Sequence, residues 1–296
     1  MGKPNSLVVD VASANKPGMV YVMLSRVQCL DQLIILDAMD PEKISVNDQV
    51  AAEAARMWKV SLNRNPCQWM NPATEGLKVC SLNTLSLRKH MEDVRSDPVL
   101  LKSQVLCLQE TWLEEGEEEQ DRYQLEGYEG HFTSVGRGRG VVTYVKEGLQ
   151  VLSHHKFAED NLQLIKTCLR QLDVISIYRS RDKPLPEAAD ILQNFIEPDK
   201  DTLIVGDFNI SAIKTNALST SLEMAGFHQH VNVPTHIKGG TFKKEYLKSC
   251  ICHNHALSGI LDHAHHRGSS TRVAVTTSSH YFSDHESVNC IVTNSR

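Results

Sequence analysis

Short apolar runs recur along the chain from residue 77 onward, and turn residues separate them. Such runs, rich in β-branched residues, are typical of strands buried on both faces. The predicted strands are 77–83, 105–110, 140–146, 162–169, 172–179, 202–209, 272–277 and 287–293. Helical patterns are fewer and predict helices at 84–95 and 186–197. Together they predict a four-layer α/β sandwich, in which two mainly antiparallel β-sheets pack face to face between helices.

Several predicted strands end in polar side chains of catalytic type. In "TLIVGDFNI" (202–210), Asp207 and Asn209 share one face of the strand because side chains alternate with a period of two. A strand-end turn explains this stretch as well as an active site does, since Asp and Asn favour turns. However, Asn83, Glu110 and Tyr178 also end apolar runs. This repetition predicts a shared site at one edge of the sandwich.

Two polar segments near the end of the sequence add an acid and an acid–imidazole pair. "GILDHAHHRG" places Asp262 after an apolar pair, and "YFSDHESVNCIV" places Asp284 and His285 before the last predicted strand. A carboxylate beside an imidazole can orient the ring and hold its charge state. Taken alone, an Asp-His pair is more often a surface turn.

The first part of the chain has a different organisation. Predicted strands lie in "SLVVD" and "QLIIL", and predicted helices at 18–28 and 47–58. A polar stretch with two prolines and no clear periodicity follows. We therefore predict a segment at 1–58, a linker at 59–76 and a larger domain at 77–296.

Composition indicates the class of protein and its cellular compartment but not its activity. The 296 residues are 41% hydrophobic and 23% charged, which is ordinary for a soluble globular protein. The net charge of −5 neither indicates nor excludes a nucleic-acid partner, because acidic residues gather at 113–121. The eight cysteines are scattered without a signal-peptide pattern, which favours buried free thiols and an intracellular, nuclear or cytosolic, setting. No apolar run is long enough to predict a membrane span.

"GMVYVMLSRVQCLDQLIIL" (18–36) resembles the last motif of Pif-type and Helitron-type DNA helicases. The resemblance implies that Arg26 corresponds to the arginine that reaches the γ-phosphate of ATP. The chain contains no G-x-x-x-x-G-K-S/T motif to hold a triphosphate, so we expect no ATPase activity from it alone. The segment 1–58 is interpreted as an incomplete C-terminal helicase segment with a vestigial arginine finger.

From 77 to 296, the ordered pieces "SLN", "LQET", "ISIYR", "GDFN", "LDH" and "SDH" resemble the endonuclease/exonuclease/phosphatase superfamily. Abasic-site and retrotransposon endonucleases belong to it. The resemblance implies a Mg²⁺-dependent phosphodiester hydrolase in which Mn²⁺ can replace Mg²⁺. Glu110 would be the principal metal ligand, helped by Asn83 and Asp284. Oxygen ligands suit Mg²⁺, and a Cys/His zinc set is absent from these motifs.

The same resemblance implies roles in catalysis for residues that act on water, the phosphate or the leaving oxygen. They are Asp207 and Asn209 for the water and phosphate, His285 held by Asp262 for the scissile phosphate, and Tyr178 for the phosphate or leaving oxygen.

Basic residues near these motifs are candidate DNA contacts. Arg137 and Arg139 lie in "SVGRGRGVVTYVKEGL" (134–149), which is similar to a Gly-rich loop of endonucleases attached to some animal Helitrons, although a flexible hairpin explains the glycines. Arg179 and Arg181 lie beside Tyr178 and would form a backbone clamp, with a solvated loop as the alternative.

Two departures from the family pattern bear on activity. Leu85 stands where many members carry an acidic residue. Residues 242–260 are a predicted insertion between "PTHIKGG" and "LDH", which would weaken activity if it displaced Asp262. Its "CICHNH" run offers zinc ligands but lacks the usual paired spacing.

The leading hypothesis is a metal-dependent DNA endonuclease derived from a Helitron-like transposon, acting in the nucleus with a helicase or transposase partner in trans. An inactive nucleic-acid-binding remnant and another phosphoesterase of the same superfamily remain as alternatives.

Overall fold

The computed structural model describes residues 7–9, 33–35, 67–71, 73–212, 215–237, 258–280 and 282–295. The chain divides into two compact units, Met1–Asn65 and Pro66–Arg296. In the first unit, β1 (Leu7–Val9) pairs in parallel with β2 (Leu33–Ile35), which confirms both strands predicted there. The predicted helices 18–28 and 47–58, and Arg26, lie outside the described residues.

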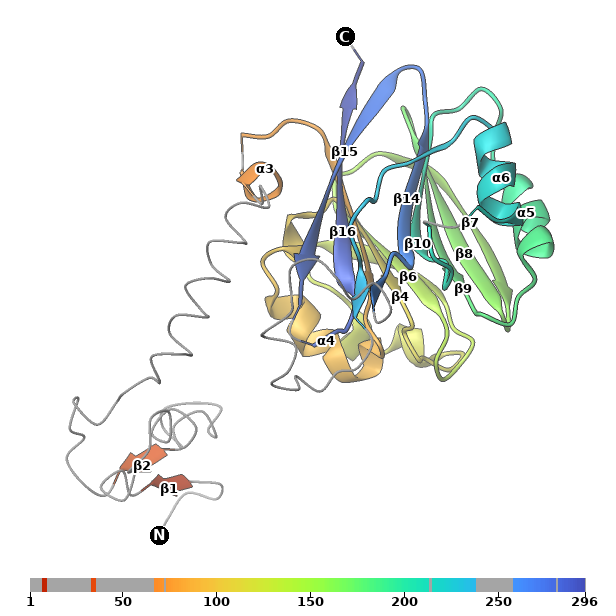
Figure 1. Cartoon of the computed structure of the whole chain (residues 1–296). Coiled ribbons are helices and arrows are strands. Elements are labelled where there is room, and N and C mark those ends of the chain that lie inside the picture. The colour runs from red at the N-terminus through yellow and green to blue at the C-terminus, as the bar shows by residue number, and fades with distance from the viewer. Residues whose placement is uncertain are drawn as a thin grey trace. The chain divides into compact units, whose positions relative to one another are not determined.

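The second unit contains two six-stranded sheets (Figure 1). The first sheet has the strand order β15-β16-β3-β4-β6-β5, and the second has the order β11-β14-β10-β9-β8-β7. The strands of the first sheet are β3 (Leu77–Asn83), β4 (Val105–Gln109), β5 (Tyr128–Thr133), β6 (Val141–Lys146), β15 (Thr271–Ser279) and β16 (Glu286–Asn294). Those of the second sheet are β7 (Val151–Glu159), β8 (Leu162–Leu169), β9 (Asp173–Arg179), β10 (Thr202–Asp207), β11 (His228–Gln229) and β14 (Asp262–Arg267).

Short elements complete the unit. They are the helices α3 (Cys67–Met70), α4 (Leu87–Ser96), α5 (Leu185–Gln193) and α6 (Ala217–Met224), the 3₁₀ turns Leu100–Lys102, Glu117–Glu119 and Asp121–Tyr123, and the two-residue strands β12 (His236–Ile237) and β13 (Ser258–Gly259). None of the helices in the described part of the chain is long and apolar enough to cross a membrane.

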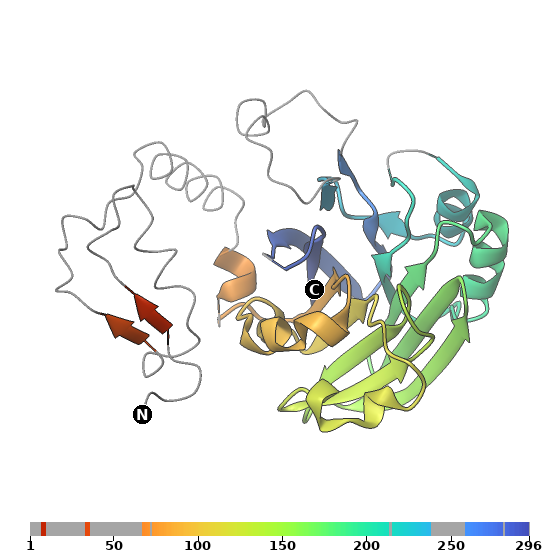
Figure 2. The same ribbon diagram turned by 90° about the horizontal axis from the view of Figure 1, so that it is seen from below.

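Three apolar clusters hold the layers together. Between the sheets, residues of β3 and β4 pack against residues of β9 and β10, including Val79, Val105, Val174 and Leu203. The buried side of α4 packs on the outer face of the first sheet. Helices α5 and α6 pack on the outer face of the second sheet (Figure 2). The predicted four-layer sandwich is therefore confirmed. Buried Cys80, Cys107, Cys168 and Cys290 are free thiols, as expected.

Each sheet has one parallel pair at its centre, and this arrangement creates the edge that carries the site. β3 runs parallel to β4, and β9 runs parallel to β10. β14 and β16 run antiparallel to β10 and β3, so their first residues lie at the same edge as the last residues of the parallel strands. In the register, Asp207 lies opposite Tyr178 on one side and Asp262 on the other.

All eight predicted strands and both helices in this unit are present, within a few residues at their ends. Sequence reasoning missed the longer elements β5, β7, β14 and α6, and the short elements α3, β11, β12 and β13. β7 is an edge strand with no fully buried residue, so it lacks the apolar signal. β14 reads "DHAHHR", and its first five residues are nonetheless buried.

Part of the segment predicted as a linker belongs to the second unit. Trp69 of α3 is only 1% exposed and packs in the cluster beneath α4. Its Nε1 donates to the Val99 carbonyl at 3.0 Å, and Lys78 Nζ donates to the Trp69 carbonyl at 2.8 Å.

The predicted insertion at 242–260 lies mostly outside the described residues, but its last residues pair with a two-residue strand that precedes it. His236 pairs with Gly259, and Ile237 with Ser258, in an antiparallel register. Ile260 is buried, and its carbonyl accepts a hydrogen bond from the Ala212 N–H. The chain thus re-enters the second sheet with Asp262 opposite Asp207.

Candidate active site

Asn83 joins the two sheets at the edge where the parallel strands end. Its side chain is fully buried. The Nδ2 group donates to Glu110 Oε1 at 3.0 Å and to Asp207 Oδ2 at 2.9 Å. One amide therefore holds two carboxylates, one from each sheet, in a fixed relation.

Glu110 is presented by a strained stretch of backbone immediately after β4. Its φ is 56°, and Trp112 two residues later has a φ of 60°. Both values lie in the left-handed region, which costs free energy for residues other than glycine and is common at functional sites. The Trp112 indole N–H donates to Glu110 Oε2 at 3.1 Å, while Asn83 binds the other oxygen. The two donors fix the orientation of the carboxylate.

Asp207 and Asn209 form a turn at the end of β10, which is one of the two explanations offered by the sequence, and Asp207 also accepts a hydrogen bond from Asn83 of the other sheet. The Asn209 N–H donates to Asp207 Oδ1 at 2.8 Å, and Asn209 has a φ of 49°. Phe208, between them, is fully buried in the cluster with α5 and α6. The alternation predicted from the strand period therefore holds.

Asp262 and His285 form a buried pair. His285 Nδ1 lies 2.8 Å from Asp262 Oδ2. The Asp262 N–H donates to Thr235 Oγ1 at 3.0 Å, which places the start of β14. The Ser283 hydroxyl accepts from the His285 N–H at 3.0 Å and donates to the Asn83 carbonyl at 2.7 Å, which ties the imidazole to the end of β3.

The buried charges shift one another's protonation. Asp207, Asp262 and His285 place one ligand atom each within 4.8 Å of the others. Burial and the neighbouring Asp262 raise the pKa of Asp207 to about 7. Burial alone would lower the pKa of His285, but Asp262 and the other nearby carboxylates raise it to about 10. At neutral pH the ring is therefore an imidazolium.

Tyr178 completes this set. It is 6% exposed and lies beside Asp207 in the register of β9 and β10. Burial, together with the nearby Glu110 and Asp207 carboxylates, raises the pKa of the phenol above its ordinary value. The hydroxyl therefore keeps its proton at neutral pH and can donate a hydrogen bond.

Asp284 lies on the histidine side of the site. Its Oδ1 is 3.8 Å from His285 Nε2, and its Oδ2 is 3.5 Å from His236 Nε2. The sequence-based prediction grouped Asp284 with Glu110 and Asn83, whereas its contacts in the structure are with the two histidines. Sequence reasoning missed His236, although its place in "PTHI", shortly before the predicted insertion, was a signal.

The residues present fit a hard divalent cation. Glu110 and Asp207 offer carboxylate oxygens that Asn83 holds close to each other. Such oxygen donors suit ions of the Mg²⁺ class, which keep several waters and need only one or two carboxylates.

Among the predicted DNA contacts, Arg137 and Arg181 are exposed and adjoin the site. The Arg137 guanidinium lies 5.5 Å from the Trp112 ring centroid. Arg181 Nε donates to Asn209 Oδ1 at 3.3 Å. Arg139 pairs with Asp160 at 3.1 Å. Sequence reasoning missed Trp112, which directly follows "LQET".

Arg179 has a different position from the one expected. It is 3% exposed, and its guanidinium donates to the carbonyls of Phe208 at 2.8 Å and Lys183 at 2.6 Å. Because its donors are used by backbone carbonyls of the loop after β9 and of the turn after β10, Arg179 supports the site from within and is not a surface clamp.

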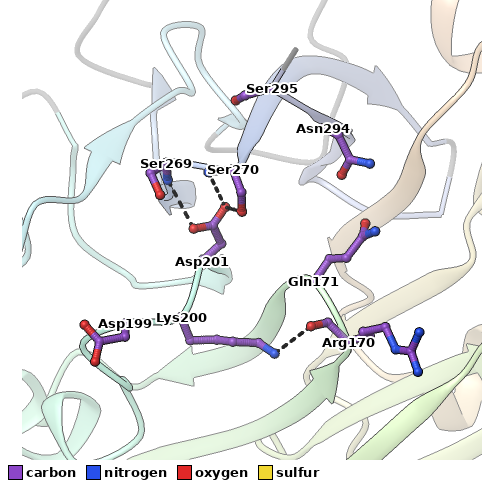
Figure 3. Close-up of a pocket in the computed structure, with 9 residues that line it drawn as sticks. All are labelled: Arg170, Gln171, Asp199, Lys200, Asp201, Ser269, Ser270, Asn294 and Ser295. Atoms are coloured by element: carbon purple, nitrogen blue, oxygen red, sulfur yellow. Dashed lines mark hydrogen bonds between the residues drawn. The ribbon is translucent and has the colours of Figure 1, made fainter.

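A polar hollow of about 470 Å³ lies at the opposite end of β10 and is distinct from this constellation (Figure 3). Its central carboxylate, Asp201, accepts from the backbone N–H groups of Ser269 and Ser270, each at 3.1 Å, and from the Ser270 hydroxyl at 2.7 Å (Figure 3). Burial opposes ionisation of Asp201, but these donors outweigh it and hold its pKa below the usual value. The carboxylate is therefore occupied in stabilising the turn between β14 and β15.

Comparisons with known proteins bear on the family and the fold of this chain. The model of the Endonuclease/Exonuclease/phosphatase family matches residues 80–285. No curated protein matches the chain significantly.

Among solved structures, the chain is similar to the AP endonuclease LMAP from Leishmania major, with 12% identity, a TM-score of 0.57, and coverage of 74% of this chain and 88% of that one. It is also similar to an AP endonuclease from Archaeoglobus fulgidus, with 20% identity, a TM-score of 0.54, and coverage of 73% and 98%. The 3′ phosphatase NExo from Neisseria, bound to a product DNA hairpin, has 13% identity, a TM-score of 0.57, and coverage of 72% and 98%. At these identities the likeness shows the fold.

Proposed function

The chain belongs to the endonuclease/exonuclease/phosphatase family, and from this premise we propose that it is a Mg²⁺-dependent DNA endonuclease that hydrolyses a phosphodiester bond by direct attack of water. The observation that carries the proposal is the buried junction at which Asn83 holds Glu110 and Asp207, with His285 and Asp262 beside them. Hydrolysis of a phosphodiester needs an oriented nucleophile, neutralised phosphate charge and help for the leaving oxygen.

Asp207 suits the task of binding and orienting the attacking water. Its pKa, raised to about 7 by burial and by Asp262, is that of a base poised near neutral pH. Asn83 and Asn209 hold its two oxygens in place.

His285 and Tyr178 suit the phosphate and the leaving oxygen. With Nδ1 engaged by Asp262, the imidazolium of His285 can present its Nε2–H to a phosphate oxygen. The protonated phenol of Tyr178 can donate to the leaving alkoxide.

Glu110 would hold the metal ion. Trp112 and Asn83 orient the two carboxylate oxygens of Glu110 for this role. The bound ion would neutralise charge on the phosphate and activate water. Asn83 acts here mainly through its amide donors, as a positioning residue.

DNA is the proposed substrate because of the neighbouring surface. Arg137 and Arg181 are exposed beside the site, and Trp112 lies within reach of the Arg137 guanidinium. Cations and an aromatic ring next to a phosphodiester site suit a nucleic-acid strand. The NExo structure named above contains DNA, which adds support by analogy.

We further propose that the chain derives from a Helitron-like transposase, acts in the nucleus and works with a helicase or transposase supplied in trans. The support is the "YVMLSRV" motif at 21–27, whose Arg26 would be the vestigial arginine finger.

A substrate panel tests the proposal. The purified chain, with Mg²⁺, Mn²⁺ or EDTA, is incubated with supercoiled plasmid, with a duplex carrying an abasic site, and with inositol phosphates. We expect metal-dependent cleavage of DNA and no phosphate release from the inositol phosphates. Phosphate release with intact DNA would instead identify another phosphoesterase, and no hydrolysis by a folded chain would identify an inactive remnant.

A further inference from the structure

His236, Asp284 and His285 form a compact group of two imidazoles and one carboxylate at the edge of the site. Their ligand atoms all lie within 4.8 Å of one another. Glu110 is outside this group. The group therefore has a different donor chemistry from the oxygen-rich junction of Glu110 and Asp207.

The backbone fixes the two histidines side by side although they are distant in sequence. An isolated antiparallel bridge joins His236 to His285, and the Glu286 N–H donates to the Thr235 carbonyl at 2.7 Å. The two imidazole centroids are 4.7 Å apart. The histidine side chains are 13% and 5% exposed, so both rings are held by packing.

Asp284 faces both rings. Its Oδ2 is 3.5 Å from His236 Nε2, and its Oδ1 is 3.8 Å from His285 Nε2. Two ligands of a tetrahedral Zn²⁺ stand about 3.4 Å apart, since each lies about 2.0–2.1 Å from the ion. Both separations are close to that value. Oδ1 is buried and has no hydrogen-bond partner in the described part of the chain.

The outer contacts also suit a metal of this kind. His285 Nδ1 is engaged by the Asp262 carboxylate at 2.8 Å, which leaves Nε2 as the atom turned toward Asp284. A carboxylate behind a ligating histidine is the usual outer arrangement at zinc centres, where it fixes the ring and raises its basicity. An ion bound at Nε2 would displace the proton there.

From this geometry we propose that His236, Asp284 and His285 form a binding site for a transition-metal ion of the Zn²⁺ class. Two nitrogens and one carboxylate leave a fourth position open, as in three-ligand zinc centres. We also propose that occupancy suppresses hydrolysis, because it engages His285 Nε2; this second part rests on the proposed function.

Binding is tested first by a readout that does not depend on activity. The metal-free full chain is titrated with Co²⁺, whose tetrahedral complexes absorb visible light, and Zn²⁺ is then added as competitor. We expect a visible band that Zn²⁺ abolishes. In His236→Gln the band should be lost, and Zn²⁺ should bind at least about tenfold more weakly. The control His155→Gln changes an exposed histidine on β7 and should keep the band.

A second control separates this site from the cysteines of "CICHNH". The double variant Cys250→Ser, Cys252→Ser should keep the visible band, because no thiolate is a proposed ligand. Circular dichroism and thermal unfolding show whether each variant is folded. Loss of the band in the double variant, or an unchanged band in folded His236→Gln, would overturn the proposed site.

Inhibition is measured as the ratio of DNA cleavage with and without micromolar Zn²⁺ in excess Mg²⁺. In the unmodified chain Zn²⁺ should slow cleavage at least about tenfold, which gives a ratio of about one tenth or less. In His236→Gln the ratio should stay near one. Equal ratios in the two would overturn the inhibitory part. Absence of any cleavage without Zn²⁺ would count against the proposed function, whereas the Co²⁺ titration would still decide whether the metal site exists.

Discussion

Asp207, Asp262 and His285 make the stability of the fold depend on pH, because two carboxylates and one imidazole lie close together in a buried site. The pKa of Asp207 is raised to about 7 by burial and by Asp262. In the unfolded chain this carboxyl ionises near pH 4, whereas in the native state it keeps its proton until about pH 7. The contribution of Asp207 to stability therefore falls as pH rises from about 4 to about 7. His285 behaves differently: its raised pKa contributes stability below about pH 6.5, which is lost as pH rises through about 10.

The Asp207→Asn variant should show a flatter dependence of stability on pH. Because asparagine does not ionise, the free energy of unfolding of the variant relative to the wild type should rise by roughly 2–4 kcal/mol between pH 4.5 and pH 8. Urea unfolding at both values, in EDTA, measures it. Asp190→Asn, at an exposed position on α5, serves as the control. A parallel pH dependence in the wild type and Asp207→Asn would contradict the buried-charge account.

The Asp262→Asn variant should move the alkaline limit of activity. Without the carboxylate at 2.8 Å, the pKa of His285 should fall from about 10 toward its ordinary value, so the imidazolium is lost nearer pH 7. We expect the alkaline limb of kcat/KM for DNA cleavage to shift down by at least about one pH unit. A limb that stays in place would show that His285 is not the group that titrates.

At the scale of elements, two parallel strand pairs explain why remote residues meet. The apolar runs of β3, β4, β9 and β10 are strong signals, so these strands and their polar ends were predictable from sequence. The pairing itself was not, because periodicity does not state which strand lies beside which. The contact between His236 and His285 depends on a bridge across about fifty residues, and no local pattern marks it.

Other elements were hidden for physical reasons. β14 buries three histidines, a residue type that gives no apolar signal in a sequence. Their partners in the structure explain the burial: His263 Nε2 lies 2.9 Å from the Ile210 carbonyl. Arg179 looked like a DNA contact because an arginine beside a site usually is exposed. Only the tertiary structure reveals that nearby carbonyls take its donors.

Gly206 sets how closely β10 approaches β9 beneath the site. Its φ is 146°, and a Cβ there would overlap the Ile177 carbonyl oxygen. Gly206→Ala should therefore destabilise the fold by roughly 3 kcal/mol or more, measured by urea unfolding. Gly127→Ala is the matched control: φ is also positive, at 76°, but nothing lies within 4 Å of its Cβ, so the cost should be about 1 kcal/mol. Equal losses would show that close approach is unimportant.

At the scale of the whole molecule, the compact unit Pro66–Arg296 contains every residue of the candidate site. The polar composition of 59–76 predicted a linker, because a single tryptophan among prolines and asparagines gives no periodic signal. The burial of Trp69 shows that the domain begins earlier.

A chain of residues 66–296 should fold and cleave DNA at a rate within about twofold of the full chain. A chain of residues 77–296 loses Trp69, whose removal from the core should cost roughly 3–5 kcal/mol. Thermal unfolding and plasmid nicking of the two truncations measure this. Equal stability would show that α3 is dispensable.

The central claim is that Glu110 binds the metal ion that DNA hydrolysis requires, and nicking of supercoiled plasmid by Glu110→Gln tests it most directly. The amide keeps the shape of the side chain and removes its charge, and Glu126→Gln, at an exposed position, is the matched control. We expect the wild type and Glu126→Gln to nick in Mg²⁺ and not in EDTA, and Glu110→Gln to lose at least about 100-fold in rate while remaining folded. Nicking by Glu110→Gln at the wild-type rate, or equal nicking in Mg²⁺ and EDTA, would contradict the account.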